Sequence, residues 1–371
     1  MRLAVVTRRL SGRGGMETAI RTLVREAARQ GVSVEVWMMG RPRQADWLHG
    51  LTARIWAIDQ GTGRRLQLKS KLPLYAWALW RGLRRYPVDA VLATDPVFVA
   101  ASLYARRFAS HPPAVLSWLH FSLAALANTP YLRLADGHLA ISQGIAGEIA
   151  ALDPKAAPEI VYNPLPDQPY PLLPASPTTQ FLYIGRLANR QKRVDLLLAS
   201  LSRLAPAWHL TVVGEGPDRA MLQHVAQTLG IAERVTWTGW QTNPWALTAS
   251  LSALVLTSDY EGFPMVLLEA LARGVPVVAT DCATGPRDIV RPGENGWLVP
   301  PGHAEPLTAA LQLAASGRTT WDRTKIQEDA CCRFGARPVV TRILQTVAAS
   351  LAPLSPANAQ AEANQRPDGG R

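Results

Sequence analysis

The feature that most constrains the fold of this chain is a proline-rich segment between two similar halves. Six prolines fall between residues 164 and 179, a density that no helix or central strand can hold. On either side, short runs rich in Val, Leu and Ala alternate with helical stretches, which is typical of α/β domains with parallel sheets. Because 371 residues suffice for two cores of ordinary size, we expect two domains joined by a linker.

The apolar runs locate the expected strands. Before the linker we expect strands at 3–6, 32–38, 88–94, 113–119, 137–142 and 159–162. After it we expect strands at 180–185, 208–214, 235–239, 252–257 and 275–280. A helical pattern runs from Lys325 to Leu351, and the residues beyond Ser355 have a composition typical of disorder. The predicted divisions are a first domain at 1–163, a linker at 164–179, a second domain at 180–333, a terminal helix at 334–351 and a disordered tail at 355–371.

One segment of the second half carries the strongest functional signal. The run Glu-Gly-Phe-Pro-Met-Val-Leu-Leu-Glu at 261–269 opens a helix directly after an apolar strand. Amides at a helix start can hold an anion, and Glu261 beside them could accept from sugar hydroxyls while Glu269 reaches a ribose. The amides available, since Pro264 has none, are those of Gly262, Phe263, Met265 and Val266. The alternative is a plain strand-to-helix corner with two solvated acids.

These residues resemble the Glu-x7-Glu motif of the family 4 retaining glycosyltransferases. That resemblance implies the GT-B fold, an α/β architecture of two Rossmann-like domains facing across a cleft, with a C-terminal helix that crosses back to the first domain. Gly-Arg-Leu at 185–187 also follows an apolar strand, and Lys192 comes six residues after Arg186, as the family places its donor-diphosphate cations. Arg193 stands where most members have glycine, so the conformation of this loop is open.

Two strand ends of the first half fit the same family. Gly14 and Gly15 lie in a Gly-Gly-x-Glu loop that is similar to the one with which the family brings its backbone close to the donor phosphate. A dinucleotide fingerprint would need a third glycine where Glu17 stands, so binding of NAD is weakly supported. His120 ends the strand at 113–119, and in the family such a histidine faces the donor sugar. A tight turn and a structural histidine are the alternatives.

The resemblance also implies a wall around the nucleotide base. Gly214 follows one strand of the second half, and Trp240 and Gln241 follow the next. By this resemblance the catalytic residues are Glu261, His120, Arg186 and Lys192. The donor-binding residues are Gly14, Gly15, Gly214, Trp240, Gln241, Gly262, Phe263, Met265, Val266 and Glu269.

Further motifs are similar to those of the bacterial lipopolysaccharide-core 1,6-galactosyltransferases. They include His-Phe-Ser at 120–122, Gly-Trp-Gln at 239–241 and Asp-Cys-x-x-Gly-Pro-Arg-Asp at 281–288, where Gly285–Asp288 suggest only a capped turn. This implies transfer of galactose from UDP-galactose to a core glucose without any other cofactor. Donors such as UDP-glucose, UDP-N-acetylglucosamine and GDP-mannose stay open, as do a nucleotide-sugar epimerase and a non-enzymatic basic binding protein.

Charge and composition bear on the partners. Residues 1–165 hold 21 Lys and Arg against 11 Asp and Glu, a net charge of 21 − 11 = +10 of the +11 total. A basic first domain fits an anionic glycolipid acceptor such as the lipopolysaccharide core, and residues 69–86 mix cations with aromatic residues as an interfacial helix or an ordinary packed helix would. We find no recognised nucleic-acid module.

Cysteine usage and hydropathy indicate the cellular compartment of the protein. The three cysteines have neither metal nor disulfide spacing, and no signal segment or membrane span is evident. We therefore expect a cytoplasmic protein held peripherally on the inner membrane. We also expect no metal, because the closest match to an Asp-x-Asp motif is Asp-Tyr-Glu at 259–261.

Overall fold

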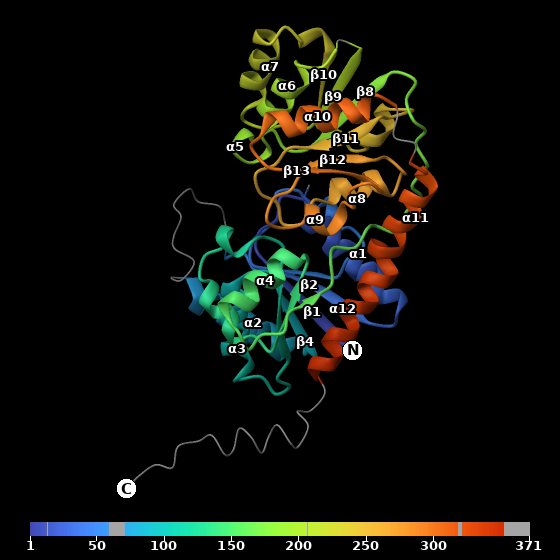
Figure 1. The fold of residues 1–371 in the computed structure, drawn as a ribbon. Helices are drawn as coiled ribbons and strands as arrows, with labels where there is room; N and C mark the ends of the chain where they lie inside the picture. Colours follow the sequence, from blue (N-terminus) through green and yellow to red (C-terminus); the bar gives the residue numbers. More distant parts are fainter. Residues whose placement is uncertain (13, 59–70, 206, 318–320, 352–371) are drawn as a thin grey trace.

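A computed structural model describes residues 1–12, 14–58, 71–205, 207–317 and 321–351 of the chain. It consists of two domains, each a parallel sheet with helices on both faces (Figure 1). The strand orders are β3-β2-β1-β4-β5-β6-β7 and β10-β9-β8-β11-β12-β13. The prediction of two Rossmann-like sheets is therefore confirmed. Their carboxyl ends gather the loops that carry most of the predicted site.

The strands are short, and several in the middle of each sheet are almost completely buried. The first sheet contains β1 (Arg2–Thr7), β2 (Ser33–Met38), β3 (Ala53–Ile55), β4 (Ala90–Ala93), β5 (Ala114–Leu119), β6 (Gly137–Ala140) and β7 (Glu159–Ile160). The second contains β8 (Thr179–Ile184), β9 (Trp208–Val213), β10 (Val235–Gly239), β11 (Ala253–Leu256), β12 (Val277–Thr280) and β13 (Gly296–Val299). Burial of β1 and β4 on both faces explains why these strands read as continuous apolar runs rather than alternating ones.

Helices connect most of these strands. The longer ones are α1 (Gly15–Arg29), α2 (Leu72–Arg85), α3 (Pro96–Arg106), α4 (Gln143–Leu152), α6 (Val194–Leu201), α7 (Arg219–Thr228), α10 (Ala304–Ala315), α11 (Arg323–Phe334) and α12 (Ala336–Leu351). The short helices α5 (Asn189–Lys192), α8 (Met265–Leu271) and α9 (Pro286–Ile289) lie near the predicted site. The 3-10 helices are η1 (Asp46–Leu48), η3 (Leu123–Ala125), η4 (Thr129–Leu134), η5 (Ala232–Arg234) and η6 (Pro244–Leu247). None of the described helices is both long and apolar enough to cross a membrane.

All eleven predicted strands are present, and two were missed. Both missed strands, β3 and β13, lie at a sheet edge and span three and four residues. Edge strands are partly exposed and need no long apolar run, so their sequence signal is weak.

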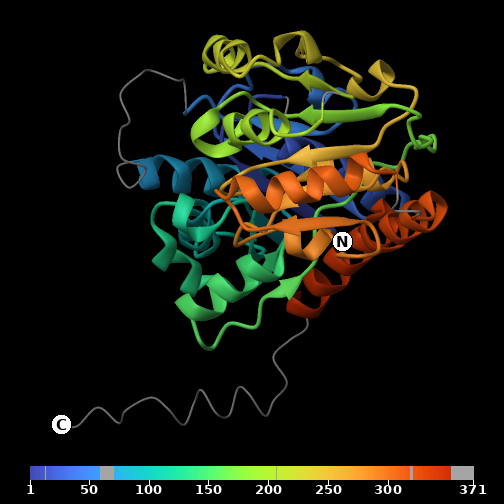
Figure 2. The ribbon, with the colours of Figure 1, turned by 45° about the horizontal axis from the view of Figure 1, so that its top comes forward.

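The C-terminal part of the chain forms two helices rather than the one continuous helix that the pattern predicts. The helical pattern from Lys325 is divided between α11 and α12, with Gly335 between them. The α12 helix packs against α1, β5 and β6 of the first domain, so the predicted crossing back is confirmed (Figure 2). Residues 164–178, all of which the structure describes, hold an isolated β-bridge at Leu165 and no helix. The predicted disordered tail lies outside the described residues.

Three aromatic rings join the domains behind the predicted site. Tyr162 stacks on Phe263 with ring centroids 5.5 Å apart, and Phe334 meets these two rings edge-on at 5.3 and 5.8 Å. The first domain, the turn before α8 and the end of α11 each contribute one ring. This cluster fixes the turn that precedes α8 against both neighbouring elements.

Candidate active site

Glu261 lies in the turn between β11 and α8, at the centre of the candidate site. Its Oε1 accepts hydrogen bonds from Lys192 Nζ at 2.5 Å and from Ser258 Oγ at 2.6 Å. The side chains of Glu261 and Lys192 are only 10% and 16% exposed, so the ion pair is shielded from solvent. No described residue donates a hydrogen bond to the second carboxylate oxygen, Oε2, so this oxygen can accept from a ligand.

Hydroxyl groups hold this turn in place. Thr284 Oγ1 donates to the carbonyl of Glu261, and Thr280 Oγ1 donates to the carbonyl of Ser258 at 2.5 Å. Sequence reasoning missed Ser258 and Thr284. Their signal was available, because hydroxyl residues follow both β11 and β12 at the carboxyl edge of the sheet.

The two predicted cations differ in their surroundings. Lys192, the last residue of α5, reaches Glu261, whereas Arg186 is exposed and its Nη2 donates to Gln191 Oε1 at 3.2 Å. Gln191 in turn donates to the carbonyl of Tyr260 at 3.0 Å. Arg186 is thus held beside the Glu261 turn through Gln191, with its guanidinium open to solvent.

Arg193 settles the conformation of the cation loop. Its φ of 46° and ψ of 46° are left-handed, a conformation that favours glycine, the residue the family resemblance leads one to expect there. Ion pairs with Asp195 at 3.1 Å and Asp259 at 3.4 Å hold the side chain. The loop therefore keeps the backbone conformation of a glycine while the arginine connects it to the Glu261 turn.

His120 lies in the contact between the two domains. Its side chain is buried, and neither ring nitrogen has a hydrogen-bond partner among the described residues. Burial lowers the pKa of His120 to about 3, so the ring is neutral at physiological pH. Gly262 packs so tightly on the carbonyl of His120 that a side chain at position 262 would collide with it. The predicted histidine and the predicted turn therefore come together across the domain boundary.

The Gly-Gly loop approaches the same place from the first domain. Gly14 caps α1 and Gly15 begins it. A Cβ at Gly15 would lie 2.9 Å from Met265 Cγ, so only a glycine allows the start of α1 to approach the start of α8. Glu17 braces the loop by accepting from the Gly12 amide at 2.7 Å and from Ser11 Oγ at 2.9 Å.

The predicted amide cluster at α8 has the expected free donors. The amides of Gly262, Phe263, Met265 and Val266 donate no hydrogen bond to any described residue. The ring of Phe263 points away into the aromatic cluster, so only its backbone is available to a ligand. The role of these amides in holding a phosphate stays a prediction.

Glu269 is placed differently from the first glutamate of the motif. Its Oε2 accepts from Trp245 Nε1 at 3.0 Å, and the guanidinium of Arg273 lies 4.4 Å from the centre of the same indole ring. Burial raises the pKa of Glu269 above its usual range, which this hydrogen bond and the charge of Arg273 oppose. The other carboxylate oxygen, Oε1, accepts no hydrogen bond from a described residue, and its contact with a ribose stays a prediction.

The predicted base wall follows the ends of β9 and β10. Gly214, with φ of 138°, donates its amide to the carbonyl of Gly239 at 2.8 Å. Trp240 is 44% exposed, and Gln241 donates its side-chain amide to the carbonyl of Thr238 at 3.0 Å. These residues share the carboxyl edge of the sheet, and their contact with a base stays a prediction.

Asp288 has a clearer role than the capped turn expected from its motif. Its Oδ1 accepts from the amide of Gln143 at 2.9 Å, at the first turn of α4 in the first domain. Burial raises its pKa, although this hydrogen bond and Arg333 oppose the shift. Asp288 therefore joins the two domains through a helix start.

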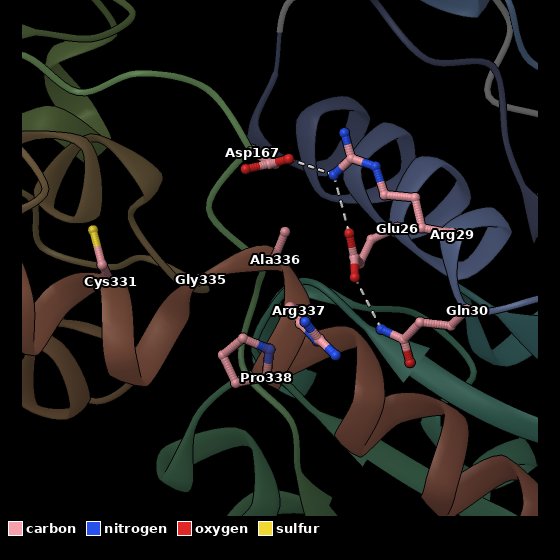
Figure 3. Close-up of a pocket in the computed structure, with 9 residues that line it drawn as sticks. All are labelled: Glu26, Arg29, Gln30, Asp167, Cys331, Gly335, Ala336, Arg337 and Pro338. Atoms are coloured by element: carbon pink, nitrogen blue, oxygen red, sulfur yellow. Dashed lines mark hydrogen bonds and ion pairs between the residues drawn. The ribbon is translucent and has the colours of Figure 1, made fainter.

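A separate cavity of about 560 Å³ lies where α1, the linker and the α11–α12 junction meet (Figure 3). Glu26 accepts there from Arg29 at 3.2 Å and from Gln30 at 3.1 Å, and Arg29 also pairs with Asp167. None of its lining residues belongs to the predicted site. Glu26, Arg29 and Asp167 pair with one another there, so the cavity lies at a junction between elements that carry the two domains.

The fold and the site together define a class of protein. Two parallel α/β domains meet at their carboxyl strand ends around an ion pair, a buried histidine and free helix-start amides. The structure matches that of a lipopolysaccharide outer core galactosyltransferase, WaaB, with a TM-score of 0.83 and 30% identity over 94% of this chain and 99% of the other. The protein is a glycosyltransferase of the GT-B fold.

The family follows from the sequence comparisons. Residues 13–168 match the model described as Glycosyltransferase Family 4, and residues 171–330 match Glycosyl transferases group 1. A lipopolysaccharide 1,6-galactosyltransferase of Escherichia coli K12 is 34% identical, covering 88% of this chain and 92% of its own length. Its counterpart in Salmonella typhimurium is 33% identical over 86% and 91%. The chain belongs to glycosyltransferase family 4.

Proposed function

We propose that this enzyme transfers galactose from UDP-galactose to a glucose of the lipopolysaccharide core, forming a 1,6 linkage with retention of configuration. The observation that carries the proposal is the similarity, along nearly the full length, to the two enzymes named for that reaction. The grouping of Glu261, Lys192 and His120 supports the same reaction class, because it supplies what a nucleotide-sugar donor needs.

Donor binding is proposed to exchange the Lys192–Glu261 ion pair for two ligand contacts. Lys192 would turn to the diphosphate, together with Arg186 and the amides at the start of α8. Glu261 would then accept from hydroxyls of the transferred sugar. Each charged group exchanges one polar partner for another, so neither is left buried and unpaired.

The proposed chemistry is a front-face displacement. The bond between the anomeric carbon and the leaving phosphate oxygen breaks, while the acceptor oxygen bonds to the same face of that carbon. The acceptor proton passes to a leaving phosphate oxygen, so no carboxylate nucleophile is needed. Lys192, Arg186 and the amides offset the charge that develops on the diphosphate, and positioning by the two domains supplies much of the rate.

His120 is proposed to act as a neutral hydrogen-bonding group. With its pKa lowered to about 3, the ring carries no charge at neutral pH and has one donor and one acceptor nitrogen. Both nitrogens lack partners among the described residues, a cost that bonds to a sugar hydroxyl would remove.

The charge of the first domain supports an anionic acceptor and a location at the membrane. The first domain carries +10 of the net +11, which suits an anionic glycolipid at the cytoplasmic face of the inner membrane. We propose peripheral attachment there.

Nucleotide release by the purified protein tests this function. UDP-galactose, UDP-glucose, UDP-N-acetylglucosamine and GDP-mannose are each supplied with and without lipopolysaccharide truncated before the galactose. The proposal predicts UDP release from UDP-galactose that the acceptor stimulates at least about tenfold. Stimulated release from another donor would keep the family and overturn the sugar, whereas interconversion of free donors would indicate an epimerase.

A further inference from the structure

A groove of about 620 Å³ lies on the outer face of the first domain, between α2 and the residues that follow β3. Its lining includes the aromatic residues Trp56, Trp77 and Trp80 and the cations Arg81, Arg84 and Arg85. Among the residues that the structure describes, no acidic one lines it. None of the predicted donor-site residues lies there, so the groove is a feature of its own.

The α2 helix presents an apolar edge to solvent beside this groove. Tyr75 and Leu79 are fully buried against the domain, whereas Leu74 and Trp77 on the opposite face are 54% and 52% exposed. Two large apolar side chains, one helical turn apart, are thus left in water. Arg81, one further turn along, continues the same exposed face.

The arginines of the groove have no acidic partners in the part of the chain that the structure describes. Arg81 and Arg84 lie over the rings of Trp77 and Trp80 at 5.6 and 5.8 Å, and neither these two nor Arg85 forms an ion pair with a described residue. Arg54 nearby is the contrast, since Glu35 binds it through two bonds of 2.6 and 2.9 Å. The groove therefore holds three cations available to an external anion.

We propose that this groove docks the enzyme on an anionic phospholipid bilayer, with lipid phosphates between the arginines and with Trp77 and Leu74 in the interface. Guanidinium groups bind phosphate oxygens in a bidentate manner, and tryptophan favours the boundary between headgroups and acyl chains. A helix with basic residues beside exposed Trp and Leu is typical of segments that lie in that boundary.

The topology places the docked helix next to the reaction. Because β3 and β4 are parallel and α2 connects them, α2 must start at the carboxyl edge of the sheet. That edge faces the second domain and carries His120 and the Gly-Gly loop. Docking through Leu74 and Trp77 therefore brings the domain boundary close to the bilayer. This inference rests on the proposed function, since a membrane glycolipid acceptor gives the contact its purpose.

Vesicle co-sedimentation of the full-length protein tests the proposal without donor or acceptor. One vesicle set contains phosphatidylcholine alone, and the other contains about 30% phosphatidylglycerol. We expect binding to the anionic set only. The double variant Arg81→Gln/Arg84→Gln should bind at least about tenfold more weakly, because each cation near an anionic surface adds roughly a fivefold effect. Trp77→Ser should weaken binding with little change in its salt dependence.

The matched control removes the same charge elsewhere. Arg203→Gln/Lys325→Gln changes two exposed residues of the second domain and α11, and should bind vesicles like the wild type. Circular dichroism checks that every variant is folded. Equal binding by the wild type and the α2 variants would overturn the proposal, as would equal binding to both vesicle sets. Binding of a soluble hexose phosphate or RNA in the groove, with no vesicle binding, would also overturn it.

The proposal and the proposed function can fail separately. With detergent-solubilised acceptor, the Arg81→Gln/Arg84→Gln variant should turn over like the wild type. Loss of vesicle binding with this activity intact supports a docking surface. An equally large loss of activity in detergent would mean that these arginines bind the acceptor, and it would overturn the docking proposal. If the wild type binds vesicles but transfers no sugar, the docking proposal is supported and the proposed reaction is wrong.

Discussion

Lys192 Nζ lies 2.5 Å from Glu261 Oε1, and these residues come from loops 69 positions apart in the sequence. The pair joins the cation loop after β8 to the Glu261 turn after β11, two strands that are neighbours in the sheet. Because both side chains are largely buried, loss of either one would leave the charge of the other shielded from water and without its ion-pair partner. The site should therefore be sensitive to single substitutions at either position.

Glu261→Gln keeps the size of the side chain and removes its charge. We expect kcat to fall by about 10² to 10³, since an oriented polar group at the reacting sugar is lost. The fold should persist, because the amide oxygen of the new side chain could still accept from Ser258. Steady-state UDP release measures the effect, and wild-type turnover by a folded variant would contradict the assignment of Glu261 to the donor site.

Lys192→Ala should weaken binding of UDP as well as turnover. An ammonium that meets the diphosphate contributes to both ground-state binding and leaving-group stabilisation. We expect about a tenfold increase in Kd for UDP by calorimetry, and a larger loss of kcat/KM. Lys155→Ala, an exposed lysine of the first domain, is the control and should behave like the wild type.

Burial of His120 should make the folded protein less stable as the pH falls. Its pKa is about 3 in the folded chain against about 6.5 when unfolded, so between these values the unfolded state binds more protons. The stabilisation is present above pH 6.5 and is lost as pH falls toward 3, with a maximum slope of about 1.4 kcal/mol per pH unit. Urea unfolding at pH 7 and pH 5 should show a smaller loss for His120→Gln than for the wild type. Equal losses would show that the histidine is not desolvated.

At position 193, a glycine variant should be more stable than an alanine variant, which is the reverse of the usual order. Because its φ is positive, Arg193→Ala keeps the backbone strain and loses the ion pairs, whereas Arg193→Gly removes the strain. We expect the glycine variant to be more stable than the alanine variant by about 1 kcal/mol in denaturant unfolding. A more stable alanine variant would mean that the loop is not left-handed.

Asp288 should influence how the two domains meet. Asp288→Ala removes the acceptor for the Gln143 amide, so the domains should separate more readily. We expect a larger radius of gyration by small-angle scattering and a several-fold higher KM for the donor, whereas Asp288→Asn, which keeps an acceptor oxygen, should show less of both. An unchanged radius in the alanine variant would argue against this role.

Much of the fold was predictable because buried parallel strands leave long apolar runs in the sequence. Edge strand β3, with Arg54 at its centre, has no such run and was missed. The Glu261 turn and Lys192 were predictable from their places after strands, but the bond between them was not. Such a bond depends on side-chain directions that spacing does not encode.

Other site features required three-dimensional information. Glu269 follows Glu261 in the motif, yet its carboxylate binds Trp245, a residue that sequence reasoning did not connect with it. The joining of Asp288 to α4 depends on how the two domains pack, which no local pattern records. By contrast, the strand-end position of His120 was predictable, although its lack of hydrogen-bond partners among the described residues was not.

The decisive measurement is transfer of labelled galactose from UDP-galactose to truncated lipopolysaccharide by the wild type and by Glu261→Gln under the same conditions. We expect a product in which the galactose is linked to the 6-position of a core glucose with the anomeric configuration of the donor, and at least a roughly 100-fold lower yield from the variant. No transfer of galactose by the wild type, while another donor is used on the same acceptor, would contradict the proposed function.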